Sequence, residues 1–174
     1  GLAQSPLAGA AAQEATAPPL PAVGSRLALP AIERLDGSRF APHDADGQVL
    51  VLYWWASWCP FCAETTPHIE ALWRAQRDKQ GRGLQMLALS IDAQPQSARD
   101  YLARRGYTLP AAWVTPAVQR ALPKPRGLPV TLVRGRDGRV LSKEFAEDTA
   151  AILAAEGIPA LVFEGVAPTP VTAY

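Results

Sequence analysis

The sequence predicts an α/β fold in which a central mixed β-sheet is flanked by helices. Two apolar runs, residues 49–55 and 84–91, are each followed by a segment with helical spacing, and this strand–helix alternation implies parallel pairing. Residues 128–141 have the pattern of an antiparallel hairpin around Asp137-Gly138. The chain has 174 residues and is 48% hydrophobic, so it can bury one core and does not require a second domain.

The two ends of the chain differ in composition from its middle. Residues 1–24 are rich in Ala, Pro, Gln, Thr and Ser, as expected for a flexible linker left after removal of a targeting segment or anchor. Residues 160–174 are expected to form a C-terminal tail. The domain between them, residues 25–159, begins with an N-terminal β-hairpin whose turn is Asp36-Gly37.

The apolar run at residues 49–55 has no polar alternation, which is typical of a strand covered on both faces. A helix is predicted over residues 60–80, with Ile69 and Leu72 on its apolar face and Gly81 at its end. Pro67 lies inside this segment and is expected to kink the helix.

The strand at residues 84–91 is followed by a second predicted helix. Asp92 is expected to cap this helix, which starts at Pro95 and ends at Gly106. The remaining predicted elements are a short strand at residues 111–114, a helical turn at residues 115–122, and a last helix at residues 148–156 that Asp148 caps.

The charge of the chain is nearly balanced, with 17 Lys and Arg against 16 Asp and Glu and a net charge of +1. This balance gives no electrostatic reason to expect nucleic acid or an anionic membrane surface as partner. No run of 18 or more apolar residues is present, so no transmembrane helix is predicted.

The two cysteines of the chain lie in the segment Trp58-Cys59-Pro60-Phe61-Cys62, directly after the first apolar strand. The strand delivers Cys59 to the start of a helix, where unpaired N–H groups and the helix dipole favour a thiolate, so Cys59 is the predicted nucleophile. Cys62 lies one helical turn further on and can form or resolve a disulfide with Cys59. Pro60 suits the first helical position, which needs no N–H. Exchange at this pair requires that water and a partner can reach its sulfur atoms.

These residues and the order of elements resemble the thioredoxin fold, and in particular the TlpA/ResA-like (DsbE-like) branch of extracytoplasmic thiol-disulfide oxidoreductases. The resemblance covers about residues 24–157. It rests on an N-terminal hairpin, on residues 54–62 as a "Phe-Trp-Ala-x-Trp-Cys-x-x-Cys" segment, on Pro67, and on a strand and helix inserted after Leu-Ser-Ile-Asp at residues 89–92.

The resemblance also implies a cis-proline facing the dithiol, at Pro129 in the segment Gly-Leu-Pro-Val-Thr. It places the backbone of Leu128 beside Cys59, where an extended partner chain can pair with it. Trp58 and Phe61 are expected at the docking surface, whereas Trp54 and Trp55 are expected to pack around the dithiol.

The sequence departs from the family at two acidic positions. Tyr53 stands where thioredoxins carry a buried Asp, and Thr65 stands where this branch often carries a Glu. Glu64 is the carboxylate nearest to the pair in sequence and is the candidate proton acceptor for Cys62, although it is turned by about 100° around the helix.

Metal binding and peroxide reduction are the alternative functions. A zinc site would combine Cys59 and Cys62 with His43 and His68, but both histidines are better explained as structural or solvated. A Cu(I)-binding metallochaperone would use the same thiolate pair. A thiol peroxidase is the enzymatic alternative, but the "Pro-x-x-x-Thr-x-x-Cys" pattern is absent before Cys59.

The resulting hypothesis is a periplasmic or otherwise extracytoplasmic oxidoreductase, anchored through a segment before Gly1, that needs no cofactor and no metal. Its implied partners are proteins with disulfides or dithiols, such as apocytochromes or copper-site proteins, and a membrane thiol donor. The resemblance favours the reductive direction.

Overall fold

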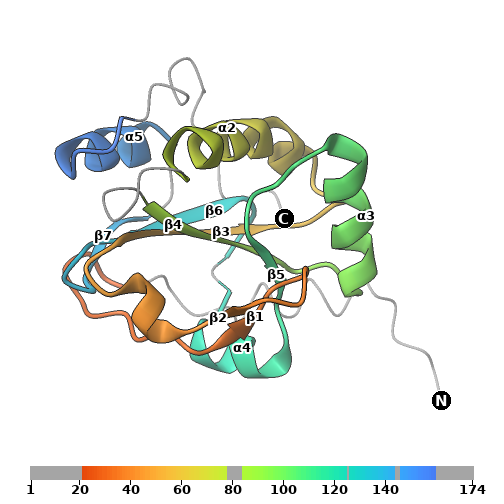
Figure 1. The fold of residues 1–174 in the computed structure, drawn as a ribbon, viewed down its shortest axis with the longest axis horizontal. Helices are drawn as coiled ribbons and strands as arrows, with labels where there is room; N and C mark the ends of the chain where they lie inside the picture. The colour runs from red at the N-terminus through yellow and green to blue at the C-terminus, as the bar shows by residue number, and fades with distance from the viewer. Residues whose placement is uncertain (1–20, 78–83, 125, 144–145, 160–174) are drawn as a thin grey trace.

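The computed structural model has a five-stranded mixed sheet with the strand order β5-β4-β3-β6-β7 (Figure 1). It describes residues 21–77, 84–124, 126–143 and 146–159. Most of the predicted linker, the predicted C-terminal tail and the predicted helix end at Gly81 lie outside these ranges. The strands of the sheet are β3 (Val49–Trp55), β4 (Leu84–Ser90), β5 (Ala111–Trp113), β6 (Val130–Arg134) and β7 (Val140–Lys143).

Strand β3 lies at the centre of the sheet and is buried along its whole length. It pairs in parallel with β4, from Val49 opposite Leu84 to Trp55 opposite Ser90, and antiparallel with β6 on its other side. The predicted burial of this strand on both faces and the predicted mixed sheet are both confirmed. The physical reason is that helices or loops cover both faces of β3, so a polar side chain at any position would be buried.

Helices lie on both sides of the sheet. Figure 1 shows α2 (Pro60–Gln76) and α5 (Ala146–Ala155) along one face, with α4 (Pro116–Ala121) on the opposite side and α3 (Pro95–Arg105) near the β5 edge. A short 3-10 helix, η1 (Pro42–Ala45), precedes β3. The α2, α3 and α4 helices each begin with proline, which fits because the first helical N–H has no partner within the helix.

Two predicted helix caps are wrong. The residue that precedes α3 is Gln94, which makes no side-chain cap, whereas Asp92 turns its carboxylate elsewhere. The last helix begins at Ala146, so Asp148 lies inside its first turn. The end of α3 is as predicted, because Gly106 has a φ of 67° and no side chain to oppose that left-handed conformation.

N-terminal segments pair with part of each edge strand of the sheet. The predicted hairpin forms from β1 (Ile32–Glu33) and β2 (Arg39–Phe40), and Leu35, just after β1, donates its N–H to the Ala111 carbonyl of β5 at 2.8 Å. At the opposite edge, Gly24 donates its N–H to the Val140 carbonyl of β7 at 2.8 Å. The backbone groups paired in this way are not available for pairing with another chain.

Within the described ranges, none of the helices combines the length and the apolar character needed to cross a bilayer.

Candidate active site

The dithiol lies where β3 ends and α2 begins. Cys59 donates its N–H to the Ala56 carbonyl at 3.3 Å, which closes a tight turn between the two elements. Cys59 then caps α2: its backbone is extended, and its Sγ accepts a hydrogen bond from the Cys62 N–H at 3.1 Å. Pro60 occupies the first helical position and is exposed. The predicted placement of Cys59 at the helix N-terminus is therefore confirmed, while its role as nucleophile stays a prediction.

Cys59 and Cys62 form a disulfide, with their Cα atoms 5.2 Å apart. Both residues are buried in this oxidised state, Cys59 with 2% and Cys62 with 1% of its surface exposed. The expectation of an accessible pair is therefore not met in the oxidised state, in which little of either residue reaches the surface.

The aromatic side chains of residues 54–61 fall into two groups by exposure. Trp54 and Trp55 are buried in the core, and the Trp55 ring packs against Tyr101 of α3 with centroids 5.5 Å apart. Their packing around the dithiol stays a prediction. Trp58, by contrast, is 54% exposed, and Phe61 is half-buried. Trp58 is thus the large apolar side chain that the turn presents to solvent beside Cys59.

The peptide bond between Leu128 and Pro129 is cis, the isomer that the resemblance implies. Val130, the next residue, pairs with Trp54, so Leu128 and Pro129 lie beside the end of β3 from which the dithiol turn starts. Leu128 is buried and Pro129 is partly exposed. The sheet register therefore brings this segment to the same end of the sheet as Cys59.

Tyr53 and Thr65, the two positions at which the resemblance implied an acid, are both buried. The hydroxyl groups of Tyr53 and Thr66 are 2.9 Å apart, and Thr66 donates to the Cys62 carbonyl at 2.6 Å. Burial raises the pKa of Tyr53 well above its ordinary value, so this hydroxyl is neutral at physiological pH and cannot act as a base. Thr65 is also buried, whereas Glu64 is exposed on α2.

A buried carboxylate that the sequence did not single out for the site holds the dithiol turn. Asp92 follows β4, is 4% exposed, and accepts hydrogen bonds from the Ser57 amide at 3.1 Å and from the Ser57 hydroxyl at 2.5 Å. The Ser90 hydroxyl also donates to it, at 2.7 Å. In the sequence, Asp92 stands out as an acid at the end of an otherwise apolar strand, but it was interpreted as the cap of the next helix.

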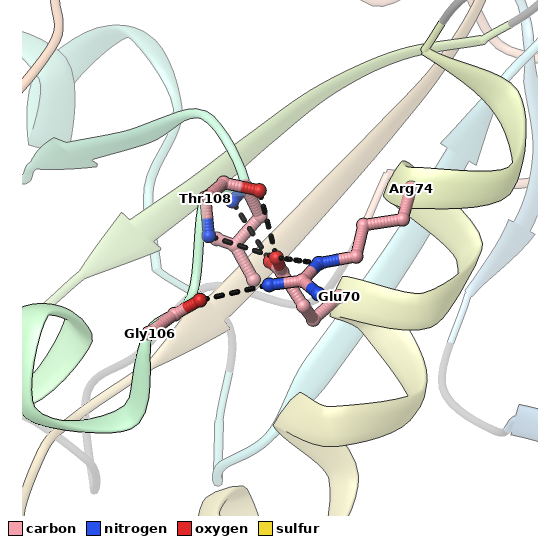
Figure 2. A network of polar contacts seen from close by, with 5 residues as sticks. Glu70, Arg74, Gly106 and Thr108 are labelled. Carbon is pink, nitrogen blue, oxygen red and sulfur yellow. Dashed lines mark hydrogen bonds and ion pairs between the residues drawn. The ribbon is translucent and has the colours of Figure 1, made fainter.

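A second buried carboxylate, Glu70, joins α2 to the loop after α3 (Figure 2). It accepts hydrogen bonds at 2.8 Å from Arg74, from the amide and hydroxyl of Thr108, and from the Leu109 amide. Burial opposes its ionisation, but these hydrogen bonds outweigh that effect and lower the pKa of Glu70 below its ordinary value. The sequence carries little signal for this burial, because Glu70 is turned by about 100° around the helix from Ile69.

The two histidines do not join the dithiol in a recognisable metal site. His43 lies on η1 and is exposed, next to Asp44, and His68 lies partly buried on α2. In the part of the chain that the structure describes, no three His, Cys, Asp or Glu side chains are grouped closely enough to hold a metal ion.

The mixed sheet, the Cys-x-x-Cys disulfide at a helix N-terminus and the cis-proline at the same end of the sheet define a thioredoxin-like protein. The chain belongs to the Redoxin family, whose model matches residues 9–152. It is 23% identical over 115 residues to the thiol-disulfide oxidoreductase ResA of Bacillus cereus, and equally to that of Bacillus anthracis. Each match covers 66% of this chain and 65% of the relative, so it spans just under two thirds of the ResA proteins.

Solved structures show the same fold. A thioredoxin-family thiol:disulfide interchange protein from Chlorobium tepidum has a TM-score of 0.67 at 19% identity, covering 78% of this chain and 98% of that one. A secreted disulfide oxidoreductase from Mycobacterium tuberculosis, homologous to DsbE of E. coli, has a TM-score of 0.59 at 16% identity, covering 72% and 94%. These likenesses confirm the predicted thioredoxin-like α/β fold.

Proposed function

We propose that this protein is an extracytoplasmic thiol-disulfide oxidoreductase that exchanges disulfides with partner proteins. The observation that carries the proposal is the Cys59–Cys62 disulfide at the N-terminus of α2, where the Cys62 N–H already donates to the Cys59 Sγ. The same N–H and the helix dipole stabilise negative charge on Cys59 once the disulfide opens. No cofactor is required, because both electrons move with the sulfur–sulfur bond.

In the proposed reductive direction, the Cys59 thiolate attacks a disulfide of the partner and forms a mixed disulfide, while one partner sulfur leaves as a thiolate. Cys62 then loses its proton and attacks Cys59, which releases the second partner thiolate and restores the Cys59–Cys62 disulfide. Tyr53 is neutral and cannot accept the Cys62 proton. The exposed Glu64 is the candidate acceptor of that proton.

The surface around the pair is proposed to orient the partner. Leu128 and Pro129 offer backbone groups for strand-like pairing, and Trp58 with Pro60 and Phe61 forms an apolar rim next to the turn. Because Cys59 is almost closed in the oxidised state, docking at this rim is proposed to uncover it.

The cellular setting belongs to the proposal as well. An extracytoplasmic location is supported by the composition of residues 1–24 and by the secreted M. tuberculosis neighbour. Proteins with thiols or disulfides are the proposed partners, with apocytochromes or copper-site proteins as substrates and a membrane thiol donor as the electron source.

The proposal is tested with Cys62→Ser and Cys59→Ser as a matched pair, incubated with cell-envelope extract and assayed for reduction of insulin. We expect Cys62→Ser to accumulate mixed disulfides through Cys59, Cys59→Ser to accumulate none, and both to lose insulin reduction. Stoichiometric Cu(I) binding by the wild type without exchange would favour the metallochaperone instead. Equilibration against glutathione then gives the reduction potential, and a strongly oxidising value would reverse the proposed direction.

A further inference from the structure

The turn that carries Cys59 is held from outside by one buried side chain. Ser57 and Trp58 lie between Ala56 and Cys59, whose backbone groups close the turn at 3.3 Å. The Asp92 carboxylate accepts hydrogen bonds from both the amide and the hydroxyl of Ser57. The tip of the turn is therefore fixed by a residue 35 positions away in sequence.

Asp92 and its neighbour Ile91 are hydrogen-bonded to the ends of three strands. Its amide donates to the Ser90 hydroxyl at 3.1 Å, and the same hydroxyl donates to its carboxylate. The Trp113 indole at the end of β5 donates to its carbonyl at 2.7 Å. The neighbouring Ile91 amide donates to the Trp55 carbonyl of β3 at 2.9 Å. The carboxylate is thus a fixed point against which the turn is positioned.

The hydrogen bonds to this carboxylate come from the neutral groups of Ser57 and Ser90. Burying a carboxylate is costly, and hydrogen bonds to a charged acceptor are stronger than neutral ones. The clamp therefore loses its strength when either the charge or the Ser57 hydroxyl is removed. Loss of the clamp lets the turn open more often, and each opening exposes a Cys59 that is otherwise 2% exposed.

We propose that Asp92 is a positioning residue that clamps Ser57 and keeps the Cys59 turn closed, so that the disulfide is protected from small thiols and reacts with docked proteins. The second part of this inference, reaction of the disulfide with docked proteins, rests on the proposed function. The first part, protection from small thiols, stands on the geometry of the oxidised protein alone.

The test measures how fast glutathione reduces the disulfide of the oxidised full chain, followed by a gel shift after thiol alkylation. We expect Asp92→Asn to raise this rate about tenfold, because opening of the turn becomes more frequent. Ser57→Ala, which removes only the hydroxyl, is expected to give a smaller increase, and Ser57→Thr is expected to restore the wild-type rate. These Ser57 variants also decide the question should Asp92→Asn not fold.

Glu70→Gln is the matched control. Glu70 is an equally buried carboxylate that accepts several hydrogen bonds, but it lies about 16 Å further along α2 than Cys59. The Glu70→Gln substitution is expected to lower stability. As long as the variant stays folded, glutathione should reduce its disulfide at the wild-type rate. Equal acceleration by Glu70→Gln and Asp92→Asn, or a change below twofold in Asp92→Asn and Ser57→Ala, would overturn the inference.

A second probe separates this inference from the proposed function. Reduced, unfolded ribonuclease A supplies protein thiols, and the wild type is expected to react with them faster per thiol than with glutathione. A wild type that prefers glutathione would count against the proposed function, while the variant effects on the glutathione rate would still decide whether Asp92 holds the turn.

Discussion

Replacement of the buried Glu70 by glutamine gives the most direct test of the packing described above. The carboxylate accepts hydrogen bonds at 2.8 Å from Arg74, Thr108 and Leu109, the backbone amides of the last two among them. Glutamine keeps one acceptor oxygen but turns an NH2 group toward N–H donors, which leaves buried donors unpaired. With about 1.5–3 kcal/mol for a hydrogen bond to a charged group, and partial compensation by the amide, we expect a loss of about 3 kcal/mol in the free energy of unfolding at pH 7.

The assay is chemical denaturation of wild type and Glu70→Gln between pH 7 and pH 3, with Glu64→Gln as the exposed control on the same helix. Because the pKa of Glu70 is lowered on folding from its ordinary 4.5, its carboxylate stabilises the fold above pH 4.5. That contribution is lost as the pH falls through the folded pKa, so the gap between wild type and variant should narrow below pH 4.5. The exposed control should change stability by less than about 0.5 kcal/mol. A gap under about 1 kcal/mol at pH 7, or one that does not depend on pH, would refute the reasoning.

Two further predictions concern the site. Tyr53→Phe removes a buried hydroxyl that pairs with Thr66, so denaturation should show a loss of about 1 kcal/mol, while the rate of disulfide exchange should stay within about twofold because Tyr53 is not a base. A much larger loss of exchange would show that the hydroxyl takes part in the chemistry. Trp58→Ala changes an exposed side chain, so stability should move by less than about 0.5 kcal/mol, whereas reduction of insulin should slow about fivefold. Unchanged insulin reduction would remove Trp58 from the docking surface.

Features set by neighbouring residues could be predicted from the sequence. The run from Val49 to Trp55 predicted the central strand because seven successive apolar residues cannot face water on either side. Proline at the first position of α2, and the glycine after α3, predicted helix ends because their backbone restrictions act within a single turn. The position of Cys59 as helix cap followed from the same local reasoning.

Asp92 shows where local reasoning stops. An Asp shortly before a proline is an ordinary helix cap, yet the turn after β3 brings Ser57 within 2.5 Å of its carboxylate. Charge-assisted bonds to a buried group are stronger than an exposed cap, so the long-range contact is the one that forms. Glu70 was missed for the same reason, since its donors Thr108 and Leu109 lie 38 and 39 residues away in sequence.

The sequence by itself determined that two cysteines, one helical turn apart, lie at the start of a helix that follows a buried strand. This was possible because helix capping and residue spacing act over a few residues. Only the tertiary structure decided that the pair is almost fully buried and that Asp92 binds the turn beside it. Burial and long-range hydrogen bonds depend on which segments the completed sheet brings together, and no short stretch of sequence contains that information.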